Sequence, residues 1–153
     1  MNKTLVFDMD GTIANLFGVD NWEPRLRSGD PTPYAEATPI WDMEVLIAVL
    51  NVLKALGWRV AVTSWLAMDS TKAYDDEVRV AKKGWLDGFG FPYDEIHLVK
   101  YGTTKANCTR KNGGVQILID DNRKVRKGWT LGDTIDPTAV DLIEELLKLC
   151  LTN

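Results

Sequence analysis

Short apolar runs recur along the chain, separated by longer segments of different character. Four of them read as strands: Leu5–Phe7, which could begin as early as Lys3, Trp58–Val62, Glu95–Val99 and Val115–Ile119. Runs of this length, bounded by polar residues and glycines, are typical of buried strands. The sequence therefore predicts at least four strands spread over the whole chain.

Between these runs the apolar residues follow helical spacing. A stripe ending at Gly57 predicts a helix opening at Thr38-Pro39, since threonine is a good N-cap and proline suits the first helical position. A more polar helix is expected over about 70–87, and Asp136-Pro137 is expected to open the last one by the same capping logic. The stripe of the first helix consists of Val45, Leu46, Val49, Leu50, Leu53 and Leu56.

Alternating strands and helices predict an α/β fold, a Rossmann-like, doubly wound parallel sheet with helices on both faces. The whole chain, 1–153, is expected to be a single domain. Residues 13–40 are rich in proline and glycine and lack a clear period, so they are interpreted as a flap or small cap inserted into that domain.

Composition narrows the function. The 153 residues carry a formal charge of −4, which argues against a general nucleic-acid coat, although a local basic groove is compatible with it. One histidine, His97, cannot supply a soft-metal ligand set, so a bound metal would have oxygen ligands. No apolar run is long enough for a membrane helix and no signal peptide is evident, so a soluble, cytoplasmic protein without a membrane partner is expected.

Polar residues stand where the predicted strands end. Asp8 and Asp10 follow the first strand, Thr63 the second, and the pair Asp120-Asp121 the fourth. Ligands of such sheets bind at the carboxyl ends of the strands, and carboxylates crowded there are best neutralised by Mg²⁺. With a lysine and a second carboxyl group, this set suits phosphoryl transfer to an aspartate nucleophile.

In order and strand context, these residues resemble the four-motif signature of the haloacid dehalogenase superfamily. The match consists of Asp8-Met9-Asp10-Gly11-Thr12, then Thr63, Lys105 and Asp120-Asp121. The resemblance implies a Rossmann-like core, Mg²⁺ and an aspartyl-phosphate intermediate. Receiver domains use similar residues, but their acidic pair comes early and their phosphorylated aspartate in mid-chain, so the order here argues against them.

The resemblance also implies roles. Asp8 would be the nucleophile and a metal ligand, and Asp10 the general acid/base with its backbone carbonyl on the metal. Many members have Gly-Asp where this chain has Asp120-Asp121, so Asp121 is expected to bind Mg²⁺ directly. Asp120 is expected to act through a bound water molecule or by supporting a direct ligand. Gly11 and Thr12 are expected to help bind the substrate phosphate.

Three assignments stay open at this stage. Thr63 is preferred over Ser64 as the hydroxyl catalyst because it directly follows the predicted strand, with Ser64 then a substrate-binding residue. Lys105 is preferred over Lys100 because it opens the segment after a Gly-Thr-Thr turn. Arg123 begins a basic run that reads either as a solvated helix face or as a contact to the substrate phosphate.

Within the superfamily, Asp120-Asp121, the TSW triplet and the short chain are similar to the small deoxyribonucleotidases and to the 3′-phosphatase domain of bacteriophage polynucleotide kinase. The expected substrate is a nucleotide or a nucleic-acid end. Aromatic residues of the insertion, Trp22, Trp41 and Tyr34, read as packing or as a surface for the base. The alternatives are a phosphatase of sugar phosphates or other small metabolites, and a non-catalytic binding or regulatory module with the same fold.

Overall fold

A parallel sheet forms the centre of the computed structural model, which describes residues 2–108 and 114–152. Within that part of the chain its five strands follow the order β5-β4-β1-β6-β7, and every neighbouring pair is parallel. The chain moves outward from β1 on one side and then returns to the other side, which places a topological switch point at β1. The strands are Lys3–Phe7 (β1), Trp58–Trp65 (β4), Glu95–Val99 (β5), Val115–Ile119 (β6) and Thr134–Ile135 (β7).

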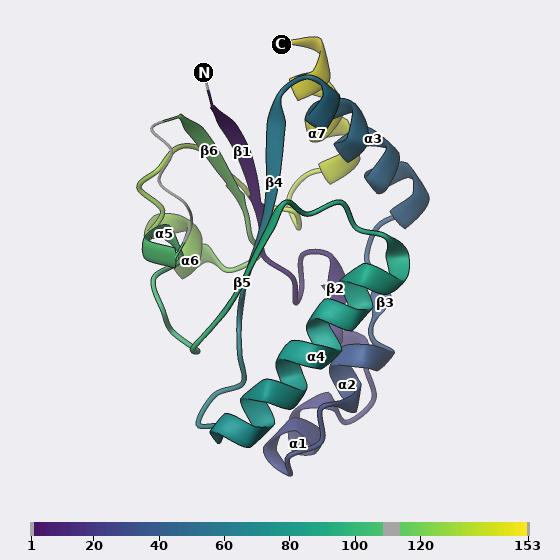
Figure 1. Cartoon of the computed structure of the whole chain (residues 1–153), viewed down its shortest axis with the longest axis vertical. Helices are drawn as coiled ribbons and strands as arrows, with labels where there is room; N and C mark the ends of the chain where they lie inside the picture. The colour runs from purple at the N-terminus through teal and green to yellow at the C-terminus, as the bar shows by residue number, and fades with distance from the viewer. Residues whose placement is uncertain (1, 109–113, 153) are drawn as a thin grey trace.

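Helices cover both faces of this sheet (Figure 1). Met43–Ala55 (α3) and Leu142–Leu151 (α7) lie on one face, and the short helices Lys105–Cys108 (α5) and Arg123–Lys127 (α6) lie on the other. Side chains of β1 alternate between two apolar clusters, as the pleat of a strand requires. The predicted Rossmann-like, doubly wound fold is therefore confirmed.

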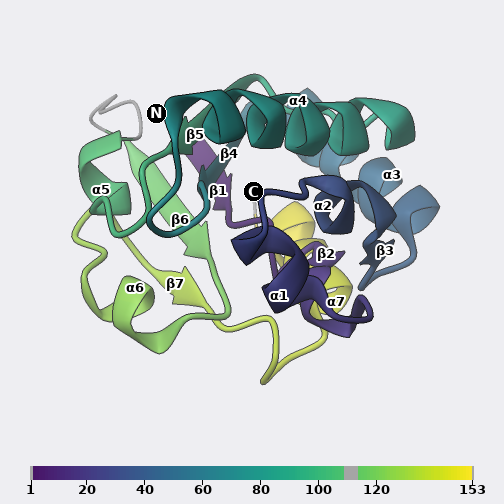
Figure 2. The same cartoon turned by 90° about the horizontal axis from the view of Figure 1, so that it is seen from below.

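The inserted segment 13–40 forms two short α-helices, one short 3₁₀ helix and a two-stranded antiparallel ribbon. It packs on the long helix Lys72–Phe89 (α4), beyond the carboxyl ends of the main strands (Figures 1 and 2). Hydrogen bonds fix it there: Tyr74 Oη donates to the Asp30 carbonyl (3.0 Å) and Trp85 Nε1 to the Ala37 carbonyl (2.7 Å). The elements are Ala14–Asn15 (β2), Leu16–Gly18 (η1), Trp22–Arg27 (α1), Thr32–Glu36 (α2) and Thr38–Pro39 (β3).

Two predicted helix starts are wrong. Thr38-Pro39 does not cap α3, because it pairs with Ala14–Asn15 as β3; the side chain of Asp42 accepts from Val45 N instead, and the helix begins at Met43. Asp136-Pro137 does not open α7 either. The Asp136 side chain accepts from Thr138 N in a local turn.

The cap of α7 is Asp141, whose side chain accepts from the backbone of Ile143 and Glu144. In both helices the cap is an aspartate a few residues after the predicted start, and no proline occupies the first helical position. The end of β4 also differs from the prediction: it extends to Trp65, so Thr63 lies inside the strand rather than after it.

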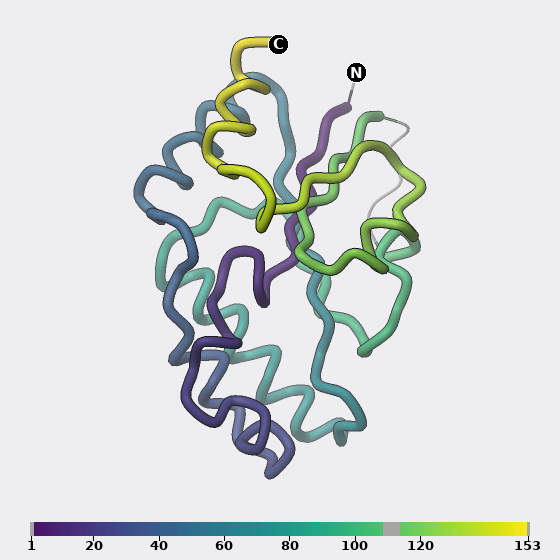
Figure 3. Tube along the Cα trace, turned by 180° about the vertical axis from the view of Figure 1, so that it is seen from behind, coloured from purple at the N-terminus to yellow at the C-terminus, as the bar shows by residue number. Residues whose placement is uncertain are grey.

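Both ends of the described chain lie at the same end of the molecule, opposite α1 and α2 (Figure 3). Among the described helices none is both long and apolar enough to cross a membrane.

Candidate active site

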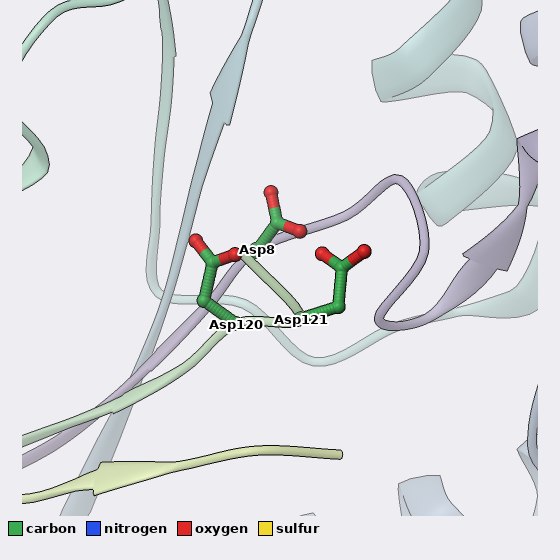
Figure 4. Close-up of side chains that lie close together, drawn as sticks. All are labelled: Asp8, Asp120 and Asp121. Carbon is green, nitrogen blue, oxygen red and sulfur yellow. The ribbon is translucent and has the colours of Figure 1, made fainter. Parts of the chain in front are cut away.

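Three aspartates converge at the carboxyl ends of the two central strands. Asp8 follows β1, and Asp120 and Asp121 follow β6, which pairs with β1 in parallel register. Each offers a carboxylate oxygen, and these oxygens lie within 4.8 Å of one another (Figure 4). Asp8 and Asp120 are buried, so the cluster is part of the interior rather than a solvated acidic surface.

Lys105 reaches this cluster from the segment that follows β5, which lies on the opposite side of β1 from β6. It is the first residue of α5 and is almost fully buried. Its Nζ donates to Asp8 Oδ1 (2.8 Å) and to Asp120 Oδ2 (2.7 Å). Burial alone would lower the pKa of Lys105, but the two carboxylates raise it above its usual value, so the side chain stays a cation. Lys100, the alternative, is exposed.

One ammonium does not neutralise three carboxylates. Burial, and then the charge of Asp8, raises the pKa of Asp120 to about 6. Burial, together with the interaction with Asp8, raises the pKa of Asp121 to about 8. Such groups favour either a proton or a cation, and closely spaced carboxylate oxygens are the ligands that Mg²⁺ prefers. The residues present therefore fit a hard divalent metal ion.

The predicted phosphate-binding loop holds the cluster in place. Thr12 is fully buried; its Oγ1 donates to Asp8 Oδ2 (3.0 Å) and accepts from Asp121 N (3.2 Å). Gly11 has φ +82°, and a Cβ there would lie 2.3 Å from Asp121 Oδ2. Both residues thus orient the aspartates, and neither lines the adjoining cavity.

Asp10 is paired with a residue that the sequence interpretation did not select. Lys82 of α4 is fully buried, and its Nζ lies 2.7 Å from Asp10 Oδ2. Burial raises the pKa of the Asp10 carboxyl, although the charge of Lys82 works against that shift. A weak signal for Lys82 exists in the sequence: it stands four residues after Val78 and three before Trp85, which puts it on the same face of the helix as these two apolar residues.

The two candidate hydroxyls face different surroundings. Ser64 lines the cavity, and its Oγ accepts from Lys82 Nζ (2.9 Å). Thr63 is fully buried and does not line the cavity, and its Oγ1 has no hydrogen-bond partner among the residues the structure describes. Neighbouring residues of a strand point to opposite sides, so only one of the two can serve the site directly. The geometry favours Ser64.

A cavity of about 770 Å³ opens beside the aspartates. Its walls combine aromatic and apolar side chains with polar and charged ones, and they come from the inserted segment on one side and from the loops after β4 and β5 on the other. The rings of Phe17 and Trp22 meet edge to face, and those of Trp65 and Tyr101 lie 4.9 Å apart between centroids. The lining includes Asp8, Asp10, Phe17, Trp22, Leu26, Tyr34, Ser64, Trp65, Met68, Tyr101, Lys105, Asp120 and Asp121.

Two of the residues considered for substrate contact lie away from this cavity. Arg123 is exposed on α6 and is not part of the lining. Trp41 is also outside it and donates its Nε1 to the Thr12 carbonyl (2.8 Å), which supports the loop after β1. Trp22 and Tyr34, by contrast, line the cavity.

Comparison with known proteins identifies the fold. No protein-family model and no curated protein sequence matches the chain. Among solved structures it is similar to D,D-heptose 1,7-bisphosphate phosphatase from Burkholderia thailandensis, with a TM-score of 0.56 and 14% sequence identity over 99% of this chain and 100% of that one. The two chains share a fold. At this identity the likeness extends to the architecture of the sheet and its helices.

Proposed function

We propose that the protein is a Mg²⁺-dependent phosphomonoester hydrolase that acts through a phosphorylated Asp8. The observation that carries this proposal is the setting of Asp8: Lys105 holds one carboxylate oxygen and Thr12 the other, beside Asp120 and Asp121 and at the wall of a cavity. The similar structure is also a phosphatase by name, which supports the reaction class.

In the first half-reaction a carboxylate oxygen of Asp8 attacks phosphorus and the bond to the leaving oxygen breaks. Asp10 donates a proton to that oxygen, so the product leaves as an alcohol. In the second half-reaction water attacks phosphorus, Asp10 takes a proton from it, and the bond to Asp8 breaks to release phosphate. Lys105 keeps positive charge beside the approaching anion throughout.

Asp8, Asp121 and the Asp10 backbone carbonyl would hold the metal ion, with Asp120 supporting them. Bound there, Mg²⁺ would offset the negative charge of the phosphate and of the carboxylates around it.

For the substrate we propose a nucleotide or a nucleic-acid end. The aromatic walls of the cavity support this, because a base offers flat surfaces that stack on aromatic rings. The similar structure is named for a sugar bisphosphate, which makes a sugar phosphate the second candidate.

The test combines a substrate panel with a nucleophile variant. Nucleoside monophosphates, 3′-phosphorylated oligonucleotides and sugar phosphates are assayed for phosphate release with and without Mg²⁺, using wild type and Asp8→Asn. We expect Mg²⁺-dependent turnover that the variant lacks, with kcat/KM for nucleotides exceeding that for sugar phosphates. Equal turnover of both classes would remove the nucleotide assignment. No turnover of any phosphomonoester would remove the enzyme and leave a binding module.

A further inference from the structure

Lys82 is a buried ammonium whose hydrogen-bonding capacity is fully used. Its Nζ donates to Asp10 Oδ2 (2.7 Å), Ser64 Oγ (2.9 Å) and the Trp65 carbonyl (2.7 Å). A lysine ammonium has three N–H donors. No donor is left for a substrate phosphate, so Lys82 does not act like Lys105.

Burying this ammonium is costly, and stability alone does not account for it. Lysine is rarely buried unless it is paired, and an apolar side chain of similar size in place of a buried ion pair is often neutral or stabilising. The side chain has no exposed surface, while the carboxyl of Asp10 is 18% exposed and lines the cavity. The pair thus has one member hidden and the other at the site.

The contacts of Lys82 join three parts of the molecule. Asp10 belongs to the loop after β1, and Ser64 and Trp65 belong to the end of β4. The Nζ also lies 4.7 Å from the centroid of the Tyr34 ring, which belongs to the inserted segment. Tyr34 and Lys82 are both buried, so this contact cannot rearrange without moving the insertion on α4.

We propose that Lys82 is a positioning residue for Asp10, and this proposal rests on the proposed function. The ammonium holds Oδ2, so that Oδ1 remains for the proton exchanged with the leaving oxygen. No side chain that the structure describes donates a hydrogen bond to Oδ1. The same ammonium fixes the carboxyl relative to Ser64, so that the phosphate and its leaving oxygen meet groups held in one rigid arrangement.

The first test compares two leaving groups. Lys82→Met is assayed with a nucleoside monophosphate, whose alcohol leaving group needs a proton, and with p-nitrophenyl phosphate, whose leaving group departs as an anion. We expect kcat/KM for the nucleotide to fall at least about tenfold more than kcat/KM for the aryl ester, because only the nucleotide depends on the acid. An equal loss with both substrates would overturn the proposal, since a general structural role lowers both.

Lys83→Met is the matched control. Lys83 is the next residue of the same helix, but its side chain is mostly exposed and bonds to Asp87, away from the site. It should retain wild-type ratios for the two substrates. A wild type inactive on both substrates would remove the proposed function itself, whereas an active wild type with a uniform loss in Lys82→Met removes only the role of Lys82.

A second variant covers the case in which Lys82→Met fails to fold because it leaves Asp10 buried without its partner. Asp10→Asn combined with Lys82→Met removes both members of the pair and avoids that uncompensated charge. If Lys82 acts through Asp10, the double variant should match Asp10→Asn alone in the rate of p-nitrophenol release in a single turnover. If the double variant instead released p-nitrophenol more slowly than Asp10→Asn alone, Lys82 would act through a group other than Asp10.

Discussion

The ammonium of Lys105 lies 2.8 Å from Oδ1 of Asp8, although 97 residues separate the two along the chain. The parallel sheet brings these residues together, because the loop after β1 and the segment after β5 both lie at the carboxyl ends of the strands. The contact gives Lys105, rather than Lys100, the place beside the proposed nucleophile.

Lys105→Met should therefore lower kcat/KM about 100-fold or more, since it removes positive charge from the position of the transferring phosphate. Without metal it should also lower the melting temperature, because Asp8 and Asp120 would lose their buried partner. Lys100→Met, at an exposed position, serves as the control and should resemble the wild type. The reverse result would assign the role to Lys100.

Ser64 and Thr63 can be separated by a pair of variants. Thr63→Val removes a buried hydroxyl without a hydrogen-bond partner among the described residues, so activity should persist and the free energy of unfolding should stay the same or rise by up to about 1 kcal/mol. Ser64→Ala should lower kcat/KM about tenfold or more, because it removes a polar group at the cavity. Steady-state kinetics and denaturant melts measure both. Loss of activity in Thr63→Val alone would restore the assignment made from the sequence.

That assignment shows where sequence reasoning reaches its limit. Apolar runs bounded by polar residues placed Glu95–Val99 and Val115–Ile119 correctly, because burial in a parallel sheet demands such runs. The end of β4 was placed three residues too early. In a strand, an error in the end point changes which of two adjacent side chains is assigned to the site.

Non-local contacts explain the other differences. Thr38-Pro39 carries a valid capping signal, but pairing with Ala14–Asn15, far along the chain, takes precedence. Asp8 could be found because it stands at a strand end, where function is expected, and Lys105 because it opens the segment after the Gly-Thr-Thr turn that follows β5. The signal for Lys82 was too weak to select it, because a lysine within a helix reads as solvated until the packing of α2 on α4 encloses it.

The raised pKa values of Asp120 and Asp121 predict how the metal-free protein responds to pH. The ordinary value, 3.8, applies to the unfolded chain, and the folded values are about 6 and about 8. Between these limits the folded state keeps protons that the unfolded state has lost, so stability is greatest below the unfolded value and falls as pH rises through the folded values.

Melting temperatures of the EDTA-treated protein should therefore fall between about pH 5 and about pH 9. Carboxyl groups whose pKa is lowered in the folded state are already ionised in this range, so they do not contribute to the fall. Mg²⁺ should raise the melting temperature most at the upper end, where it binds carboxylates that carry no proton. Asp121→Asn is the control and should flatten both trends. If the melting temperature of the metal-free wild type did not depend on pH, the pKa values of Asp120 and Asp121 would not be raised in the folded protein.

Gly11 offers a test of the link between the loop after β1 and the metal cluster. Its φ of +82° disfavours any other residue, and a Cβ would lie 2.3 Å from Asp121 Oδ2 and 2.8 Å from the Phe17 ring. Gly29 has a similar φ of +87°, but a Cβ there would have nothing within 4 Å. The two glycines therefore share the backbone penalty, and only Gly11 adds the collision with Asp121.

Gly29→Ala should cost about 1 kcal/mol of unfolding free energy, as expected for a left-handed alanine, and leave the binding of Mg²⁺ unchanged. Gly11→Ala should cost more, and it should weaken the binding of Mg²⁺, measured by calorimetry, by about tenfold or more because the Asp121 carboxylate must turn away. The difference between the two variants isolates the collision from the backbone effect. If Gly11→Ala binds Mg²⁺ as tightly as Gly29→Ala, the orientation of Asp121 does not depend on this glycine, and Asp121 is not the ligand that the loop positions.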